Sequence, residues 1–356
     1  MQVGRLPEWV YRDCADPSQP HRQRALDRQN ALTKPTGALG RLEALAIDLA
    51  GLQATDCPRA RLAPIIVFAG DHGVAVHGVS AYPQDVTVAM MANFAAGGAA
   101  ISVLARELGS RLEVVDAGSR AASPITGTVS DKPRCGSRDF SQYAALDPQD
   151  VAFAFECGKR AIQRAMEGVP DLVILGEMGI GNTTSASAIA AALLGVEAAM
   201  VAGNGTGLDA AGRARKVAVI DKALSDYGLR NSDPPAEKVL AAVGGLEIAA
   251  LSGAIIVAGQ AGLPVLVDGF IVSVAALAAT KLNPSCRPYL LFSHRSAEDG
   301  HRRVLDALVA RPLLDLDLRL GEGSGAALAL PILRLACALH NGMATFAEAA
   351  VPDRAL

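Results

Sequence analysis

Short apolar runs recur along the chain, and each of them ends in glycine and polar residues. Strands that are buried on both faces are typically near-continuous apolar runs, and strands that alternate with helices form parallel sheets. The pattern therefore predicts an α/β, doubly wound fold with a mostly parallel six-stranded sheet flanked by helices. The six runs that we expect to form the strands are residues 64–73, 112–119, 171–182, 196–207, 263–269 and 287–296.

Segments rich in Ala and Leu separate most of these runs and have helical patterning. We expect helices within 87–108, 151–168, 184–194, 208–229, 245–261 and 270–281. The two ends of the chain are also helical in pattern, and neither contains a convincing strand. We therefore expect an α/β domain over residues 61–300 and a small, discontinuous helical domain made of residues 1–60 and 301–356. The Pro- and Ser-rich stretch 120–150 is expected to form a long excursion.

One uncharged stretch, Ile248–Val267, is long enough to span a membrane. Glycines and a proline interrupt it, so we interpret it as a buried helix followed by a break and a strand. The composition supports a globular protein: 51% of the residues are hydrophobic, 19% are charged, and the net charge is −3. This balance excludes a disordered chain and gives no basic surface for nucleic acid or an anionic membrane.

The six cysteines are scattered without a C-x-x-C pair, which fits neither a disulfide framework nor a zinc site. The first residues, MQVGRLPEWVYRDC, contain no apolar core of a secretory signal. We therefore expect free thiols and a cytoplasmic protein.

Polar residues follow every expected strand, and ligands of open parallel sheets bind beyond the carboxyl ends of the strands. These residues are Asp71 with His72, Asp116, Glu177, Asn204, Asp268, and Ser293 with His294. Turns between strands and helices are always polar, which is the alternative explanation. Their presence at all six ends favours a binding site.

Residues 179–185, GIGNTTS, join an expected strand to an expected helix, where backbone N–H groups can bind an anion. The segment lacks the lysine of a P-loop and the third glycine of a dinucleotide fingerprint, so we favour a monophosphate. An ordinary capped turn would explain it as well. Residues 203–207, GNGTG, offer a second cradle after the next run, and the two together favour a phosphorylated sugar as ligand.

Glu322 has glycines on both sides and precedes an apolar helical segment. A carboxylate aimed into an apolar pocket has a raised pKa and can act as a general base, although a solvated loop glutamate fits the pattern equally. His72 and His77 lack a third ligand nearby, so we expect no metal site. The chain contains no nucleophile motif, and covalent catalysis has no candidate.

Taken together, these motifs resemble the nicotinate-nucleotide–dimethylbenzimidazole phosphoribosyltransferase family. The similar stretches run in family order: KPTGALGRLE (34–43), FAGDHGVAVHGVSAYPQDVT (68–87), NFAAGGAAI (93–101), GEMGIGNTTSASAI (176–189), GNGTGLD (203–209), LPVLVDGFI (263–271), SHRSAE (293–298) and LGEGSGAALALPIL (320–333). The resemblance implies a doubly wound α/β homodimer with a smaller helical domain drawn from both chain ends. It also implies a transfer of phosphoribose from nicotinate mononucleotide to 5,6-dimethylbenzimidazole, which releases nicotinate and forms α-ribazole 5′-phosphate, with no cofactor and no metal.

The resemblance also implies a role for each matching residue. Glu322 matches the general base, Glu177 a second functional carboxylate, and Lys216 a cation that offsets the phosphate or the nicotinate carboxylate. Phosphate and ribose contacts are expected at Gly179, Gly181, Asn182, Thr183, Gly205, Ser293 and Ser296. The aromatic base is expected near Ser80, Tyr82, Met90, Met178 and Leu320.

One position departs from the family pattern: Ala89 stands where some members have Gln. The identity of the lower base therefore stays open among benzimidazoles, purines and phenols. Two other functions compete with the transferase. The first is an NAD-dependent dehydrogenase, which the missing dinucleotide fingerprint disfavours. The second is a non-catalytic nucleotide-binding protein of the same fold, which the intact glycine–glutamate–glycine loop disfavours.

Overall fold

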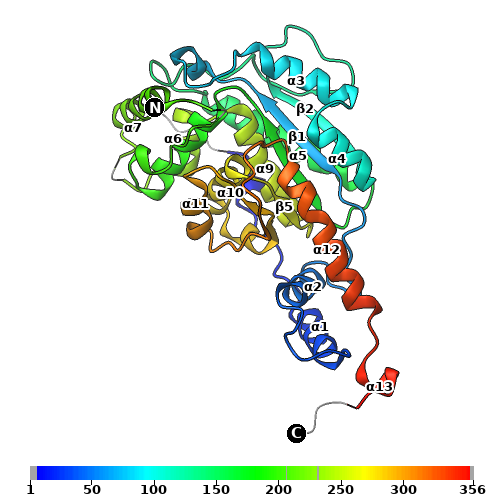
Figure 1. Ribbon diagram of the computed structural model, residues 1–356. Helices are drawn as coiled ribbons and strands as arrows, with labels where there is room; N and C mark the ends of the chain where they lie inside the picture. The colour runs from blue at the N-terminus through cyan, green and yellow to red at the C-terminus, as the bar shows by residue number, and fades with distance from the viewer. Residues whose placement is uncertain (1–5, 206, 231, 353–356) are drawn as a thin grey trace.

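The computed structural model describes residues 6–205, 207–230 and 232–352. Its central feature is a six-stranded sheet in which all strand pairs are parallel, with the order β3-β2-β1-β4-β5-β6 (Figure 1). The doubly wound α/β class and the parallel sheet are therefore confirmed. The strands are β1 (Ile65–Gly70), β2 (Leu112–Gly118), β3 (Val129–Ser130), β4 (Val173–Met178), β5 (Val265–Val267) and β6 (Leu290–Phe292).

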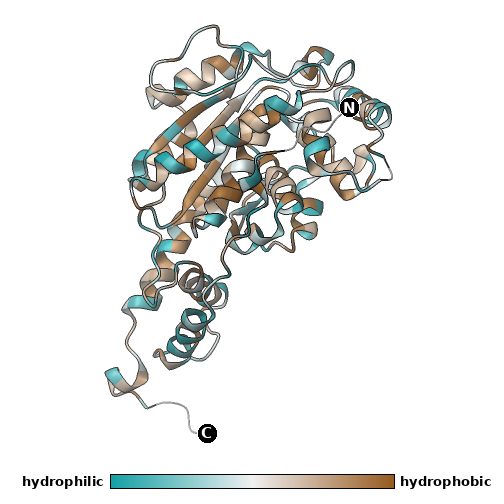
Figure 2. Ribbon diagram, turned by 180° about the vertical axis from the view of Figure 1, so that it is seen from behind, coloured by the Kyte–Doolittle hydropathy of each residue, from teal (hydrophilic) through white to brown (hydrophobic). Residues whose placement is uncertain are grey.

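Two hydrophobic cores lie on opposite faces of the sheet, because successive strand side chains point to opposite sides. On β1, Ile66 and Phe68 belong to one core, whereas Ile65 and Val67 belong to the other. The first core is covered by α5 (Pro148–Met166), α6 (Asn182–Leu194), α8 (Ala236–Val243), α9 (Leu246–Gln260) and α10 (Phe270–Leu282). The second is covered by α3 (Asp85–Ala96), α4 (Ala100–Leu108) and the first half of α12 (Ser324–Gly342). In Figure 2 the strands between these layers are strongly hydrophobic.

Five of the six expected strands exist, and one expectation is wrong. Residues 196–207 form no strand: a short 3-10 helix, η3 (Ala198–Met200), leads into a loop instead. The run VEAAMVAG contains three alanines and only two β-branched residues, and alanine favours a strand less than β-branched residues do. The sixth strand of the sheet is β3, a two-residue edge strand inside the expected excursion 120–150.

The helix expected over 87–108 is two helices, because Gly97 ends α3 with φ +85°. The residues 85–108 together are long and apolar enough to cross a membrane by length and composition, but only 33% of an apolar 18-residue stretch within them is buried in the chain. The expected buried helix within 248–267 is α9, followed by strand β5. Helix α7 (Ala210–Asp226) also lies where we expected one, whereas α8 was not expected.

A helical extension projects from the sheet at one end of the molecule (Figure 1). It contains α1 (Gln19–Ala31), α2 (Arg41–Leu52), the second half of α12, and α13 (Phe346–Ala349). The two ends of the chain meet there in a β-bridge between Leu32 and Thr345. The short helix η1 (Glu8–Tyr11) instead packs on α5, where the rings of Trp9 and Phe155 are 6.5 Å apart. The exact domain boundaries stay a prediction.

The remaining described elements are two short strands, one helix and two 3-10 helices. The two-residue strands β7 (His294–Arg295) and β8 (Leu314–Asp315) form a separate parallel pair. Helix α11 (His301–Ala307) lies between them in the sequence and packs against α10. The 3-10 helices η2 (Gly73–His77) and η4 (Pro284–Tyr289) follow β1 and precede β6. The segment after η4 thereby delivers His294 and its neighbours to the carboxyl end of the sheet.

Candidate active site

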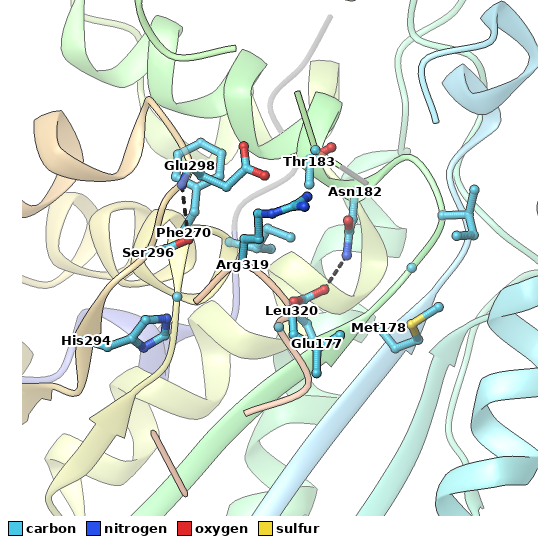
Figure 3. A pocket seen from close by; sticks show the side chains of 16 residues that line it. Glu177, Met178, Asn182, Thr183, Phe270, His294, Ser296, Glu298, Arg319 and Leu320 are labelled. Atoms are coloured by element: carbon cyan, nitrogen blue, oxygen red, sulfur yellow. Dashed lines mark hydrogen bonds between the residues drawn. The ribbon is translucent and has the colours of Figure 1, made fainter. Parts of the chain in front are cut away.

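A pocket opens at the carboxyl ends of β4, β5 and β6, with an empty volume of about 640 Å³ that includes some open solvent (Figure 3). Ligands of open parallel sheets bind at this edge, as we expected from the strand ends. The lining residues are Glu177, Met178, Gly179, Ile180, Asn182, Thr183, Gly205, Gly269, Phe270, Ile271, His294, Ser296, Glu298, Arg319, Leu320 and Gly321.

Glu177 lies near the end of β4 and is 5% exposed. The side-chain amide of Asn182, the first residue of α6, donates a hydrogen bond to Glu177 Oε2 (Figure 3). Burial raises the pKa of Glu177 well above the ordinary value, and the negative charges of Asp268, Glu247 and Glu322 add to this rise. Glu177 therefore keeps its proton to a higher pH than an exposed glutamate does.

Glu322 lies on the loop that crosses β4 and leads into α12. Its φ of +65° is in the left-handed region, as are those of Gly321 (+86°) and Gly323 (+85°). The Glu322 amide donates to the Glu177 carbonyl at 3.2 Å, and its carboxylate accepts from the Ile101 amide of α4 at 3.4 Å. Burial raises the pKa of Glu322, the Ile101 amide opposes that rise, and the charge of Asp268 increases it. Glu322 itself does not line the pocket, although its neighbour Gly321 does.

The expected phosphate cradle is the turn between β4 and α6. Gly181, with φ +95°, immediately precedes α6, whose first N–H groups have no partner within the helix. Lys216 of α7 is fully buried, and its ammonium donates to Thr183 Oγ1 at 2.9 Å and to the Gly203 carbonyl at 3.4 Å. Desolvation lowers the pKa of Lys216 to about 8. A helix N-terminus beside a buried cation is a suitable site for one phosphate group.

The second cradle, residues 203–207, lies beside the first. A Cβ at Gly205 would be 3.0 Å from Thr183 Oγ1 and 3.6 Å from the Lys216 ammonium. Thr206 lies outside the described residues. Both glycine-rich segments therefore converge on Thr183 and Lys216, even though the run before the second one forms no strand.

Some expected residues do not line this pocket. Ser80 and Tyr82 lie in the turn before α3, where the Tyr82 amide donates to Ser80 Oγ at 3.2 Å. Met90 of α3 packs against the same hydrophobic core as Met178. Gly181, Lys216, Ser293 and Glu322 lie behind the lining residues rather than among them. The roles of all these residues stay predictions.

The two histidines of the GDHG segment have local partners. His72 Nε2 lies 2.6 Å from Glu247 Oε1, and both side chains are fully buried. His77 Nε2 lies 2.9 Å from Asp139 Oδ2. Among the described residues, no group of three or more His, Cys, Asp or Glu side chains could hold a metal ion.

Sequence reasoning gave no role to several side chains that line the pocket, among them Phe270, Glu298 and Arg319 (Figure 3). Phe270 and Glu298 lie inside stretches that carry the family resemblance, so that resemblance could have identified them. Arg319 lies in the alternating run LDLDLRL (314–320), two residues before Gly321 of the glycine–glutamate–glycine loop, and neither signal was used to identify it. Only the folding of that loop over β4 brings Arg319 to the pocket.

A family model described as "Phosphoribosyltransferase" (DBI_PRT) matches residues 14–351. The chain belongs to this phosphoribosyltransferase family. It is similar to the nicotinate-nucleotide–dimethylbenzimidazole phosphoribosyltransferase of Bradyrhizobium diazoefficiens, with 67% identity over 98% of this chain and 99% of that relative. It is also similar to the enzyme of the same name from Pseudomonas aeruginosa strain PAO1, with 54% identity over 98% of this chain and 99% of that relative.

Solved phosphoribosyltransferases have the same fold. The crystal structure of the enzyme of this name from Thermus thermophilus matches with a TM-score of 0.89 and 41% identity, over 95% of this chain and 100% of that one. A second structure from the same organism, named CobT, matches with a TM-score of 0.90 and 42% identity, over 94% of this chain and 100% of that one. The family resemblance that we described from the motifs is therefore confirmed over nearly the whole chain.

Proposed function

We propose that the protein transfers phosphoribose from nicotinate mononucleotide to 5,6-dimethylbenzimidazole, with release of nicotinate and formation of α-ribazole 5′-phosphate. This is the activity that the names of its relatives state. The observation in the structure that supports it best is the pair of buried carboxyl groups, Glu177 and Glu322. They lie beside the glycine-rich turn before α6, where Lys216 donates a hydrogen bond to Thr183. The product supplies the lower ligand of cobalamin.

In the proposed reaction, one ring nitrogen of the base attacks C1′ of the ribose. The C1′–N bond to nicotinate breaks, its electron pair stays on the pyridine nitrogen, and the anomeric carbon inverts. The opposite ring N–H of the base must lose its proton, and Glu322 accepts it as general base. A raised pKa brings this carboxylate closer to neutrality, where proton transfer is most effective.

We assign Glu177 an orienting role. The raised pKa favours the protonated form of Glu177 over a wider pH range than for an exposed glutamate, and that form can donate a hydrogen bond to the base. Neutral Glu177 would stabilise growing positive charge on the ribosyl ring less well than a carboxylate would. The sequence was compatible with either role, orienting the base or stabilising positive charge on the ribosyl ring. The burial of Glu177 favours the orienting role.

The remaining contacts follow the pocket. Lys216 and the N-terminus of α6 face the 5′-phosphate, with Gly179, Gly181, Thr183 and Gly205 giving close backbone approach. Ser293 and Ser296 are assigned to the ribose or phosphate, and Asn182 acts there through its hydrogen bond to Glu177. Met178 and Leu320 supply apolar walls for the base, together with Ser80, Tyr82 and Met90 from the neighbouring elements. Ala89 leaves the choice among lower bases open.

We further propose a homodimer in the cytoplasm. Helices α3 and α4 expose an apolar outer face, and only 33% of an apolar 18-residue stretch within 85–108 is buried in the chain. Small apolar side chains on that face are Ala89, Ala92, Ala96, Ala100 and Val103, all of which are exposed. A second copy packed there would remove this area from water. The chain needs no cofactor in this scheme.

The deciding experiment measures nicotinate release from nicotinate mononucleotide by the purified protein, with and without 5,6-dimethylbenzimidazole and without added metal. We expect base-dependent release and a new ribosylated product on chromatography. Absence of release with benzimidazoles, purines and phenols would contradict the transferase and leave a non-catalytic nucleotide-binding protein. If a product formed only with a base other than 5,6-dimethylbenzimidazole, the transferase activity would be supported and the proposed acceptor would be wrong.

A further inference from the structure

The loop that carries Glu322 is held against the sheet at very close range. A Cβ on Gly176 of β4 would lie 2.5 Å from the Glu322 carbonyl carbon and from the Gly323 nitrogen. A Cβ on Gly325 would overlap the imidazole ring of His294. The start of α12 is therefore enclosed between β4 and the segment that follows β6, and its position determines where the Glu322 carboxylate lies.

Asp268 provides the polar anchor for this loop. It follows β5 directly and is 1% exposed. Asp268 Oδ2 accepts the Gly323 amide at 3.0 Å, and Oδ1 accepts the Ala326 amide at 2.9 Å. The two oxygens therefore hold both sides of Ser324, the first residue of α12.

This arrangement replaces an ordinary helix cap. The first N–H groups of a helix have no partner within the helix, and a side chain at the N-cap position normally accepts one of them. The N-cap of α12 is Gly323, which has no side chain and so cannot form such a bond. Asp268 supplies the missing acceptors from the end of the neighbouring strand β5.

We propose that Asp268 is the positioning residue that fixes the Glu322 carboxylate at the reacting base. The role rests on the proposed function, because it acts on the general base of that reaction. Asp268 does not line the pocket, so it acts through the loop and not by contact with a substrate. By accepting the Gly323 and Ala326 amides, Asp268 holds residues 323–326 in place. Glu322 immediately precedes this segment, so its position depends on the same anchor.

The charges around Glu322 add a second signature. Asp268 faces it from the end of β5 and Glu177 from the end of β4, whereas α4 presents the Ile101 amide. His294 lies beside Asp268, with its Nδ1 3.7 Å from Asp268 Oδ1. Since the Asp268 charge raises the pKa of Glu322, its removal lowers that pKa. Activity falls at low pH as Glu322 becomes protonated, so this fall in kcat/KM then occurs at a lower pH.

The test compares D268N, which loses charge and one acceptor, with D268E, which keeps the charge but displaces both oxygens. We expect kcat to fall about 100-fold in both variants with KM for nicotinate mononucleotide within about threefold, because a small displacement of a catalytic group has this effect. Only D268N should shift the acid limb of kcat/KM. The exposed Asp306 of α11 gives the matched control D306N, with unchanged kcat. A D268E enzyme with full kcat would overturn the positioning role.

The double variant with E322Q separates positioning from general damage. If Asp268 acts through Glu322, D268N should lower the residual kcat of E322Q by less than about threefold, because residues that act as a unit are not additive. An additional loss equal to that seen in the wild-type background would overturn the proposal.

Hydrogen exchange on the wild-type protein decides the matter even if D268N does not fold. The Gly323 and Ala326 amides should exchange slowly, although first-turn amides without an acceptor exchange fast. Fast exchange at both would overturn the anchoring. A wild-type protein without transferase activity would refute the proposed function alone, because the exchange measurement does not depend on it.

Discussion

Glu322 is the residue that we propose as general base, and its backbone is in a conformation that non-glycine residues avoid. A residue other than glycine in the left-handed region costs about 1 kcal/mol or more and persists only where the surroundings impose it. Here Gly321 and Gly323 turn the chain on both sides, and the Glu177 carbonyl accepts the Glu322 amide. The strained backbone conformation therefore belongs to Glu322, whose carboxylate must point in a fixed direction to act as a base.

Replacing Glu322 by Gln should remove the base and preserve the shape of the loop. We expect kcat to fall by about 10²- to 10⁴-fold, the usual contribution of general base catalysis, with KM for nicotinate mononucleotide nearly unchanged. Steady-state kinetics with both substrates measures this. A parallel loss of donor affinity would mean that Glu322 binds rather than catalyses.

The titration of Lys216 predicts how donor binding depends on pH. Burial lowers its pKa to about 8, so its positive charge is complete well below that pH and is lost as the pH rises above it. The affinity for nicotinate mononucleotide should therefore decrease as the pH rises through about 8. Calorimetric titration at several pH values tests this.

The control for this prediction is Lys216→Met, in which the donor binds weakly and the pH dependence over the same range disappears. Lys222 of the same helix is exposed and ion-paired with Asp226, so Lys222→Met should leave the wild-type profile unchanged. An unchanged profile in Lys216→Met would show that another group titrates.

At the residue scale, the sequence predicted the side chains that carry strong local signals. Glu177, Asn182 and Thr183 lie at the end of a strand or just beyond it, Gly205 belongs to a glycine-rich turn, and all four line the pocket. The contact between Asn182 and Glu177 was not predictable, since it depends on the rotamers of two buried side chains. Arg319 was missed although its neighbours carry signals: the alternating run LDLDLRL (314–320) contains it, and the Gly321–Glu322–Gly323 loop begins two residues later.

Among the secondary-structure elements, α12 has the most demanding environment. Its first turn approaches the His294 ring so closely that residue 325 has no space for a side chain. Gly325→Ala should push the helix away from β7 and lower the free energy of unfolding by about 1–3 kcal/mol, as overpacking does. Because the same turn follows Glu322, kcat should fall as well.

Gly342 at the other end of α12 provides the control, since a Cβ there meets nothing within 4 Å. Gly342→Ala should not reduce stability or activity. Denaturant unfolding and steady-state kinetics measure both variants. A Gly325→Ala protein with wild-type stability would mean that the His294 ring can move aside.

The elements that were predicted well are those with a dense apolar pattern. Strands β1, β2 and β4 contain Ile, Val and Leu and are largely buried, so periodicity identified them. The alanine-rich run 196–207 showed the limit of this signal, because alanine fits a buried helix or loop as well as a strand. Strand β3 has only two residues and forms through its pairing with β2, which no local pattern reveals.

At the scale of the whole molecule, the outer face of α3 and α4 gives a prediction about assembly. A homodimer should have twice the 36.6 kDa mass of the chain in light scattering. Ala92 is exposed near the middle of this face, and Ala92→Arg should dissociate the dimer by placing a charge in an apolar contact. A dimer that survives this change would place the interface elsewhere.

The overall arrangement of the sheet was predictable, whereas the extension was predictable only as helices. Parallel strands with intervening helices have few allowed topologies, so the α/β class followed from the sequence. The packing of α2 on α12 and the bridge between Leu32 and Thr345 join segments from opposite ends of the chain. Local periodicity carries no information about such contacts.

Helix α12 joins the extension to the loop of Glu322, the proposed general base, and this has a mechanical consequence. With 19 residues it is about 28 Å long, it starts two residues after Glu322, and its far end packs against α2. A movement of the far end of α12 would therefore displace Glu322 beside its near end. Pro331 inside the helix is the point at which a bend can be absorbed. A change that displaces the extension, such as a bulky fusion at the chain's end, should therefore shift the Glu322 carboxylate and lower kcat, unless the helix bends at Pro331.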